Sequence, residues 1–88
     1  MKSFKSVIVV LDKGFVYFGD LHFNGAMWEL TNASNIRRYG TERGLGQLSL
    51  TGPTAETTLD KVRTVYFFQR ALQQVIECDE EAWIEKKK

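Results

Sequence analysis

The sequence predicts a mainly β, single-domain protein with five strands, of the kind found in a small barrel, that spans residues 1–88. Val7–Leu11 is a β-branched run with the length of one strand, and Asn24-Gly25 is the dipeptide most typical of a tight hairpin. Met27–Thr31 alternates apolar and polar side chains, as a half-buried strand does. A single domain fits the chain length, since 88 residues suffice for one hydrophobic core.

The first two strands are expected to form a hairpin. Phe4–Leu11 should be buried on both faces, because its centre is continuously apolar. Asp12–Gly14 then makes a three-residue turn, with glycine placed where a positive φ is needed. The second strand, Phe15–Leu21, contains Gly19, and a glycine inside a strand predicts a bend or a close backbone approach.

The third strand is Met27–Thr31, which Asn32–Asn35 either prolongs or leaves by a turn. A long glycine-rich loop is expected from Tyr39 to Thr58, with Gln47–Leu50 as a candidate short strand within it. Unstructured loops of this length are uncommon in compact domains, and many of them are functional.

The chain should end in two strands and a helix. Val62–Phe68, which is β-branched and aromatic, is the expected fourth strand, and Leu72–Cys78 is the fifth. Asp79 is a candidate cap for a short C-terminal helix or turn, with Glu80 and Glu81 at its positive end.

Composition limits the classes of protein to consider. The formal net charge is +1, so no overall field attracts nucleic acid or membrane, and any electrostatic recognition must come from local clusters. Cys78 is the only cysteine, which rules out an internal disulfide and predicts a half-buried, inert thiol. Val7–Leu11 is too short for a signal-peptide core or a membrane span, so we expect a cytoplasmic protein without a membrane partner.

Catalytic signals are few. His22 is the only histidine, and Asp20 lies two residues before it on the same strand face. No nucleophile motif accompanies this pair, and the acidic run Asp79–Glu81 fits a helix start better than a metal site. We therefore expect no enzyme, no cofactor and no metal site. A hydrolase that uses His22 and Asp20 is the catalytic alternative.

Residues 35–46 form the one concentration of binding-type side chains, with three arginines and one glutamate. Guanidinium groups match phosphate geometry, aromatic rings stack on bases, and glycines let backbone N–H groups approach an anion. The alternative is a solvated loop whose arginines pair with Glu29, Glu42, Glu56 or Asp60. The candidate ligand-binding residues are Asn35, Arg37, Arg38, Tyr39, Thr41, Arg43 and Gly44, together with Arg70.

Lys61, Arg63 and Arg70 make a second basic patch. Lys61 and Arg63 are two residues apart, so on a strand they share a face. Such charges either protect a sheet edge or, if the patch neighbours the arginine segment, extend it into one basic surface. Trp28 and Trp83 are interpreted as core or interface anchors.

Part of the chain resembles the Sm fold family. Ser6–Gly14, Phe18–Leu21 and Leu30–Ala33 resemble the first Sm motif, and Tyr66–Ile76 is similar to the second, especially in the bacterial RNA chaperone of that family. The resemblance implies a five-stranded, SH3-like bent barrel that pairs edge strands into a homo-oligomeric ring. The residues of the chaperone's uridine pocket would fall on Gln69 and Arg70, of which only Arg70 keeps a positive charge.

A second resemblance covers nearly the whole chain. Residues 32–41, 43–48, 52–54, 59–60 and 75–79 resemble small uncharacterised proteins of tailed phages and prophages. This resemblance implies a bacteriophage setting in the cytoplasm of the bacterial host. By analogy, we expect an anti-defence role, either by sequestering a nucleotide signal or by blocking a host defence protein.

Together, these observations predict a non-catalytic phage accessory protein. Its expected ligand carries phosphate and is either a nucleotide signal or a short single-stranded nucleic acid. The alternative is a protein-interaction or structural phage module that binds a host or virion protein without nucleotide.

Overall fold

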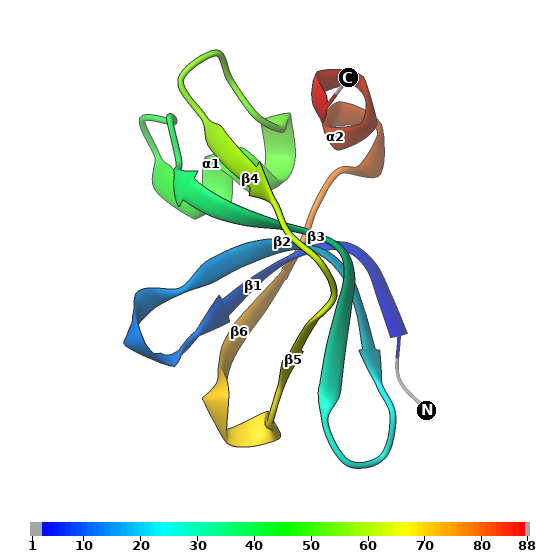
Figure 1. Cartoon of the computed structure of the whole chain (residues 1–88). Coiled ribbons are helices and arrows are strands. Elements are labelled where there is room, and N and C mark those ends of the chain that lie inside the picture. The colour runs from blue at the N-terminus through cyan, green and yellow to red at the C-terminus, as the bar shows by residue number, and fades with distance from the viewer. Residues whose placement is uncertain (1–2, 88) are drawn as a thin grey trace.

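The computed structural model describes residues 3–87, apart from the side chains of residues 84–87. Six strands form one antiparallel sheet in the order β4-β3-β2-β1-β6, and β5 pairs with the same edge of β3 as β4 does (Figure 1). The strands are β1 Ser3–Leu11, β2 Val16–Phe23, β3 Trp28–Arg38, β4 Thr58–Lys61, β5 Val65–Phe67 and β6 Leu72–Glu77, and the helices are α1 Gly44–Thr51 and α2 Glu80–Lys87.

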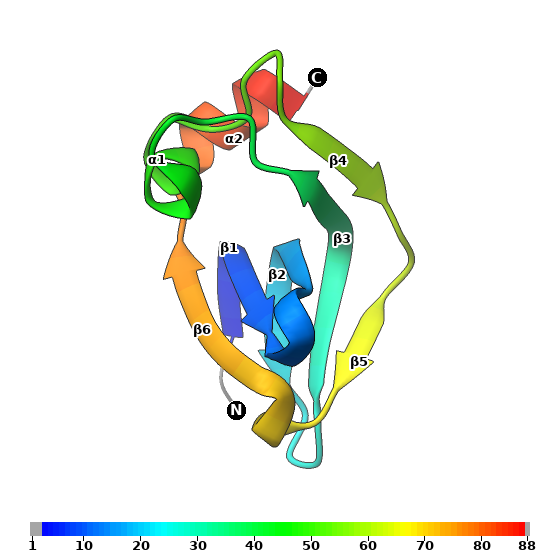
Figure 2. The ribbon, with the colours of Figure 1, turned by 90° about the vertical axis from the view of Figure 1, so that its left-hand side faces the viewer.

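The sheet curls without closing. β5 and β6 form two edges that approach each other where the 3-10 helix Gln69–Ala71 connects them (Figure 2). No ladder among residues 3–87 joins β6 to β4 or β5. The predicted mainly β architecture is thus confirmed, whereas the predicted five-stranded barrel is wrong, since six strands form an open sheet.

The extra strand comes from the length of β3. Asn32–Asn35 prolong the third strand, so that it runs from Trp28 to Arg38. Its first part pairs with β5, through Trp28–Leu30, and its last part pairs with β4, through Ser34–Arg38. Within the expected fourth strand Val62–Phe68, only β5 forms a strand. β4 precedes it, and the chain leaves the edge of β3 between the two.

β1 lies at the centre of the packing. Val7, Ile8 and Val9 are fully buried, which confirms the prediction of a strand covered on both faces. One core contains Val7, Val9, Leu11, Leu21, Trp28, Leu30, Ala33 and Phe67. The other contains Ile8, Val16, Phe18, Ile36, Leu48 and Trp83.

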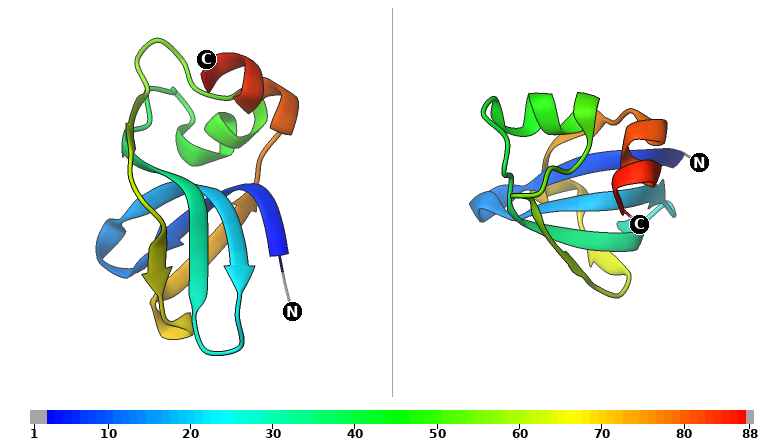
Figure 3. Two further views of the ribbon diagram at one scale, coloured as in Figure 1. Left: turned by 45° about the vertical axis from the view of Figure 1, so that its right-hand side comes forward. Right: turned by 90° about the horizontal axis from the view of Figure 1, so that it is seen from above.

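Both helices lie at one end of the sheet, where they cover the second core (Figure 3). Leu48 comes from α1 and Trp83 from α2, and the Trp83 ring stacks on Phe18 with 3.8 Å between the ring centroids. Asp79 accepts the N–H of Ala82 through Oδ1 at 3.3 Å, so the predicted cap of the C-terminal helix is confirmed. Neither described helix has the length and hydrophobicity that a membrane crossing requires.

The segment from Tyr39 to Thr58 is more ordered than predicted. Gln47–Leu50 lies within α1, so the short strand expected there is wrong. The Thr57 hydroxyl donates to the Tyr39 carbonyl at 2.6 Å. The Thr54 hydroxyl donates to the Gly40 carbonyl, also at 2.6 Å. These two bonds tie the end of the segment to its beginning.

The predicted turn glycines have the expected roles. Gly14 and Gly25 both have positive φ, at 84° and 97°, in the turns that precede β2 and β3. Asn24 closes the second turn, since its Oδ1 accepts the N–H groups of Ala26 and Met27 at 2.9 Å. Gly19 lies against β3, where an added Cβ would be 2.7 Å from the Thr31 carbonyl oxygen.

Candidate functional site

The two adjacent arginines of the predicted site pair with carboxylates of the same chain. Arg37 Nε lies 2.7 Å from Asp60 Oδ2, and Arg38 Nη2 lies 3.6 Å from Glu56 Oε1. Both pairs are exposed, and an exposed ion pair contributes only about 0–1 kcal/mol. A phosphate could therefore displace either carboxylate at low cost.

Other residues of the predicted site form hydrogen bonds with other residues of the same chain. Asn35 Nδ2 donates to the Val16 carbonyl at 3.1 Å, and the Thr41 hydroxyl donates to the Gly44 carbonyl at 2.7 Å. The backbone N–H of Arg43 donates to Gln47 Oε1 at 3.1 Å. The Thr41 and Arg43 contacts brace the entry to α1, whereas the Asn35 contact joins β3 to β2. Tyr39 is partly exposed just before this entry.

Arg70 lies apart from these residues. It belongs to the 3-10 helix between β5 and β6, at the end of the sheet away from α1 (Figure 1). The predicted ligand-binding residues therefore belong to two separate regions of the fold.

Three cations that form no ion pair with the described side chains follow the outer edge of the sheet. Lys61 ends β4, Arg63 lies in the connection to β5, and Arg70 follows β5; all three are exposed. None has a carboxylate within ion-pair distance in the part of the chain that the structure describes. The chain also contains no Asp or Glu between Lys61 and Ile76. We call Lys61, Arg63 and Arg70 the basic edge.

Two exposed aromatic side chains lie along the basic edge. Tyr66 and Phe68 are each 58% exposed, whereas Phe67 between them is buried in the first core. The sequence analysis missed these two residues as site candidates. The row of three aromatics was a usable signal, because alternation along a strand turns the first and third to one face.

The β3–β4 ladder places one end of the basic edge, Lys61, beside the arginine segment of residues 35–46. Lys61 is opposite Ser34, and Asp60 is opposite Asn35. Asp60 stands between the two regions, where it pairs with Arg37. The Lys61 end of the basic edge is therefore a neighbour of the arginine segment, with a carboxylate between them, whereas Arg70 lies at the other end of the sheet.

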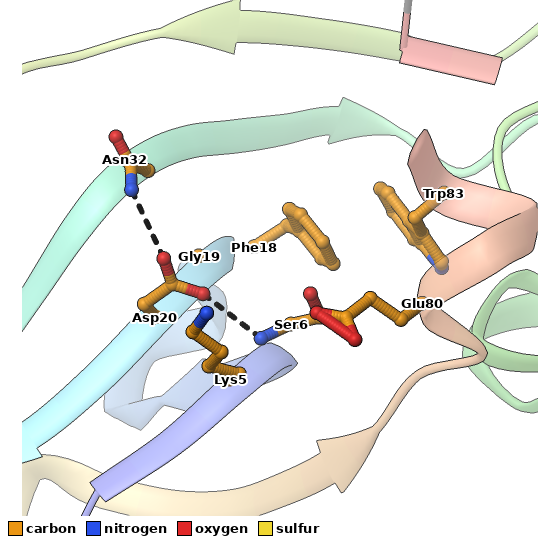
Figure 4. Close-up of a pocket in the computed structure, with 8 residues that line it drawn as sticks. All are labelled: Lys5, Ser6, Phe18, Gly19, Asp20, Asn32, Glu80 and Trp83. Carbon is orange, nitrogen blue, oxygen red and sulfur yellow. Dashed lines mark hydrogen bonds between the residues drawn. The ribbon is translucent and has the colours of Figure 1, made fainter. Parts of the chain in front are cut away.

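A crevice of about 250 Å³ opens between β1, β2, β3 and α2 (Figure 4). Its lining residues are Lys5, Ser6, Phe18, Gly19, Asp20, Asn32, Glu80 and Trp83. Both strand ladders that meet there change register, between Phe4 and Val7 and between Phe18 and Asp20. The crevice is therefore a product of two bulges at the same level of the sheet.

Asp20 holds both bulges in place. Its Oδ1 accepts the backbone N–H of Ser6, and its Oδ2 accepts from Asn32 Nδ2, both at 3.0 Å. Ser6 and Asn32 have φ of 54° and 50°, a region that non-glycine residues rarely adopt. Because each carboxylate oxygen has a donor from the same chain, Asp20 acts as a structural clamp.

His22 contacts a hydroxyl group. Its Nδ1 lies 3.0 Å from the Ser3 hydroxyl, whereas the Asp20 carboxylate is bonded to Ser6 and Asn32. The hydrogen bond between His22 and Asp20 that a hydrolase would use is therefore not formed by these two side chains. Within residues 3–87, no group of three His, Cys, Asp or Glu side chains is arranged to hold a metal ion.

Cys78 is half-buried, as predicted. Burial raises the pKa of its thiol to about 12, against a smaller opposing effect of a hydrogen bond with the Ile8 backbone. At pH 8 only about one thiol in ten thousand is then ionised, and the thiolate is the reactive form.

We expect Cys78 to react with a thiol reagent at pH 8 about a thousandfold more slowly in the folded protein than in denaturant. The folded rate should rise tenfold per pH unit up to pH 11. Since the folded state holds this proton more tightly, the contribution of Cys78 to stability falls as the pH rises above about 8.5. Equal rates in the folded and denatured protein would contradict the burial of this thiol.

Comparison with protein-family models, curated proteins and solved structures finds no match to this chain. The phage-protein resemblance and the Sm resemblance therefore stay predictions.

Proposed function

We propose that this protein is a non-catalytic binder of phosphate-bearing ligands, which it holds along the basic edge. The observation that carries the proposal is the run from Lys61 to Ile76, in which Lys61, Arg63 and Arg70 have no carboxylate among them. Cations without partners keep their full attraction for an anion, and guanidinium groups bind phosphate through two parallel hydrogen bonds.

The arginine segment extends this surface. Arg37 and Arg38 are ion-paired, but their exposed pairs are weak enough for phosphate to compete with Asp60 and Glu56. In this arrangement the ligand binds the cations of the basic edge directly, and it binds Arg37 and Arg38 only by displacing their carboxylates. The site is an open surface, which favours an extended ligand over a nucleotide enclosed in a pocket.

The phage setting belongs to the proposal as well. An oligomeric protein in the host cytoplasm that sequesters a phosphate-bearing ligand would act against host defence by depleting that ligand. The competing proposal is an interaction module for a host or virion protein, favoured by Tyr66 and Phe68, because exposed aromatics are typical anchors of protein interfaces.

A charge-matched pair of variants tests the proposed function. Arg63→Gln with Arg70→Gln should weaken binding of a fluorescein-labelled ten-residue oligothymidylate about tenfold at low salt. The slope of log K against log salt should become shallower by about 1.4, since each phosphate contact on a single strand contributes about 0.7. Fluorescence anisotropy at a series of salt concentrations measures both quantities.

Lys5→Gln with Lys13→Gln is the matched control. Both lysines are exposed, and this variant also removes two positive charges. It should bind the oligonucleotide nearly as the original protein does. An equal loss of affinity in both double variants would mean that net charge, and not the basic edge, attracts the oligonucleotide. Absence of binding by the original protein would refute the proposed function.

A further inference from the structure

The two exposed aromatic residues of the sheet edge are arranged as a pair. Tyr66 and Phe68 are two residues apart in extended backbone, so both point away from the core that holds Phe67. Residues at this separation on a strand lie about 6.6 Å apart. Within residues 3–87, neither ring makes an aromatic contact, and the Tyr66 hydroxyl has no hydrogen-bond partner.

The backbone that carries this pair is fixed. Phe67 is opposite Trp28 in the β3–β5 ladder, and both are buried in the first core. The Trp28 indole N–H donates to Gln69 Oε1 at 3.2 Å. The Ala71 N–H donates to the Phe68 carbonyl at 3.0 Å. The backbone that carries the two exposed rings is therefore held on both sides, which lowers the backbone entropy that binding would cost.

Cations lie on either side of the ring pair along the chain. Lys61 and Arg63 precede it, and Arg70 follows it. The carboxylate opposite the pair is Glu29, which faces Tyr66 in the ladder and accepts from Asn24 Nδ2 at 3.0 Å. The order along the chain is thus two cations, two rings and a third cation.

We propose that Tyr66 and Phe68 are a stacking platform for successive bases, and that the ligand of the basic edge is a single-stranded nucleic acid. This inference rests on the proposed function and adds the class of ligand to it. A single strand offers both exposed bases and phosphates, as this surface requires. A duplex hides its bases in the stack, and an acidic peptide supplies charge without a row of flat rings.

The length of the edge sets the size of the bound strand. Arg70 follows Lys61 by nine positions in the chain, and fully extended chain covers at most about 30 Å over that separation. That length corresponds to about four or five nucleotides, at the lower end of site sizes for single-strand binders. Affinity should therefore rise steeply with oligonucleotide length up to about five nucleotides and only slowly at greater lengths.

The test combines one double variant of the rings with two oligonucleotide probes. Tyr66→Leu with Phe68→Leu keeps apolar side chains at the edge but removes the flat faces. An abasic oligonucleotide of ten residues keeps the phosphates but removes the bases. The original protein should bind ten-residue oligothymidylate at least about tenfold more tightly than the abasic strand. The double variant should bind both strands equally, with an unchanged salt dependence.

Phe15→Leu is the control for the ring variants, because Phe15 is also exposed, at 56%, and lies in the turn before β2. It should leave both affinities unchanged. Equal binding of the two strands by the original protein would overturn the stacking platform and leave the basic edge intact, and this arm needs no variant. Tighter binding of a ten-residue oligoglutamate than of oligothymidylate would overturn the platform in favour of a protein partner.

Discussion

Replacing Trp83 with alanine should lower the free energy of unfolding by about 3–5 kcal/mol. Trp83 is 1% exposed, stacks on Phe18 at 3.8 Å, and donates from Nε1 to the Leu48 carbonyl at 3.1 Å. It thus joins α2 to both the sheet and α1. Truncation would leave a cavity beneath α2, one of the more costly changes that a core can undergo. The Leu48 carbonyl would lose one of its two donors and keep the Gly52 N–H, which donates to it at 2.9 Å.

Urea unfolding followed by circular dichroism measures this effect. Trp83→Phe is the informative control, because it keeps a ring against Phe18 and loses only part of the volume and the Nε1 hydrogen bond. It should cost about 1–2 kcal/mol. An unfolding midpoint that is the same for Trp83→Ala and the original protein would mean that α2 does not stabilise the sheet.

The parts of the fold that were predictable are those fixed by neighbours in sequence. The continuous apolar run around Ile8 required burial on both faces, and Asn24-Gly25 required a tight turn. Asp79 had the side chain and position of a helix cap. In each case the controlling contacts lie within a few residues, so local patterns determined the outcome.

The parts that were missed depend on distant contacts. α1 contains Gly44 and Gly46, and glycine has a low helix propensity, so the segment looked like a loop. The burial of Leu48 against β1 and α2 stabilises the helix there. The additional strand β4 and the short length of β5 likewise follow from the length of β3, which no pattern within Val62–Phe68 records.

The candidate site was half predictable for the same reason. A sequence shows where arginines are concentrated, but it does not show which carboxylates form ion pairs with them in the fold. Arg37 meets Asp60, 23 residues away, only because β4 pairs with β3. Arg70 was identified from its charge alone, whereas Tyr66 and Phe68 needed the ladder that buries Phe67 and turns them outward.

Gly40→Ala should destabilise the protein by about 3 kcal/mol or more, the second large effect that we expect. Gly40 has φ of 69°, which costs an alanine about 1–2 kcal/mol. An added Cβ would also lie 2.3 Å from the Glu56 carbonyl carbon and 2.4 Å from the Thr57 nitrogen. Backbone atoms cannot move aside as a flexible side chain can, so the turn at residues 54–57 would have to shift.

Gly44→Ala separates the two contributions. Gly44 has φ of 68°, nearly that of Gly40, but nothing lies within 4 Å of its added Cβ. Its cost should therefore be the backbone term alone, about 1–2 kcal/mol. Denaturant unfolding gives the free energy of unfolding of both variants. The difference between the two values is the cost of the steric overlap between an alanine at position 40 and the backbone of Glu56. Because Arg38 pairs with Glu56 beside this approach, Gly40→Ala should also release that carboxylate. Equal destabilisation by the two substitutions would show that Gly40 and Glu56 are not in contact, and that the segment from Tyr39 to Thr58 is open.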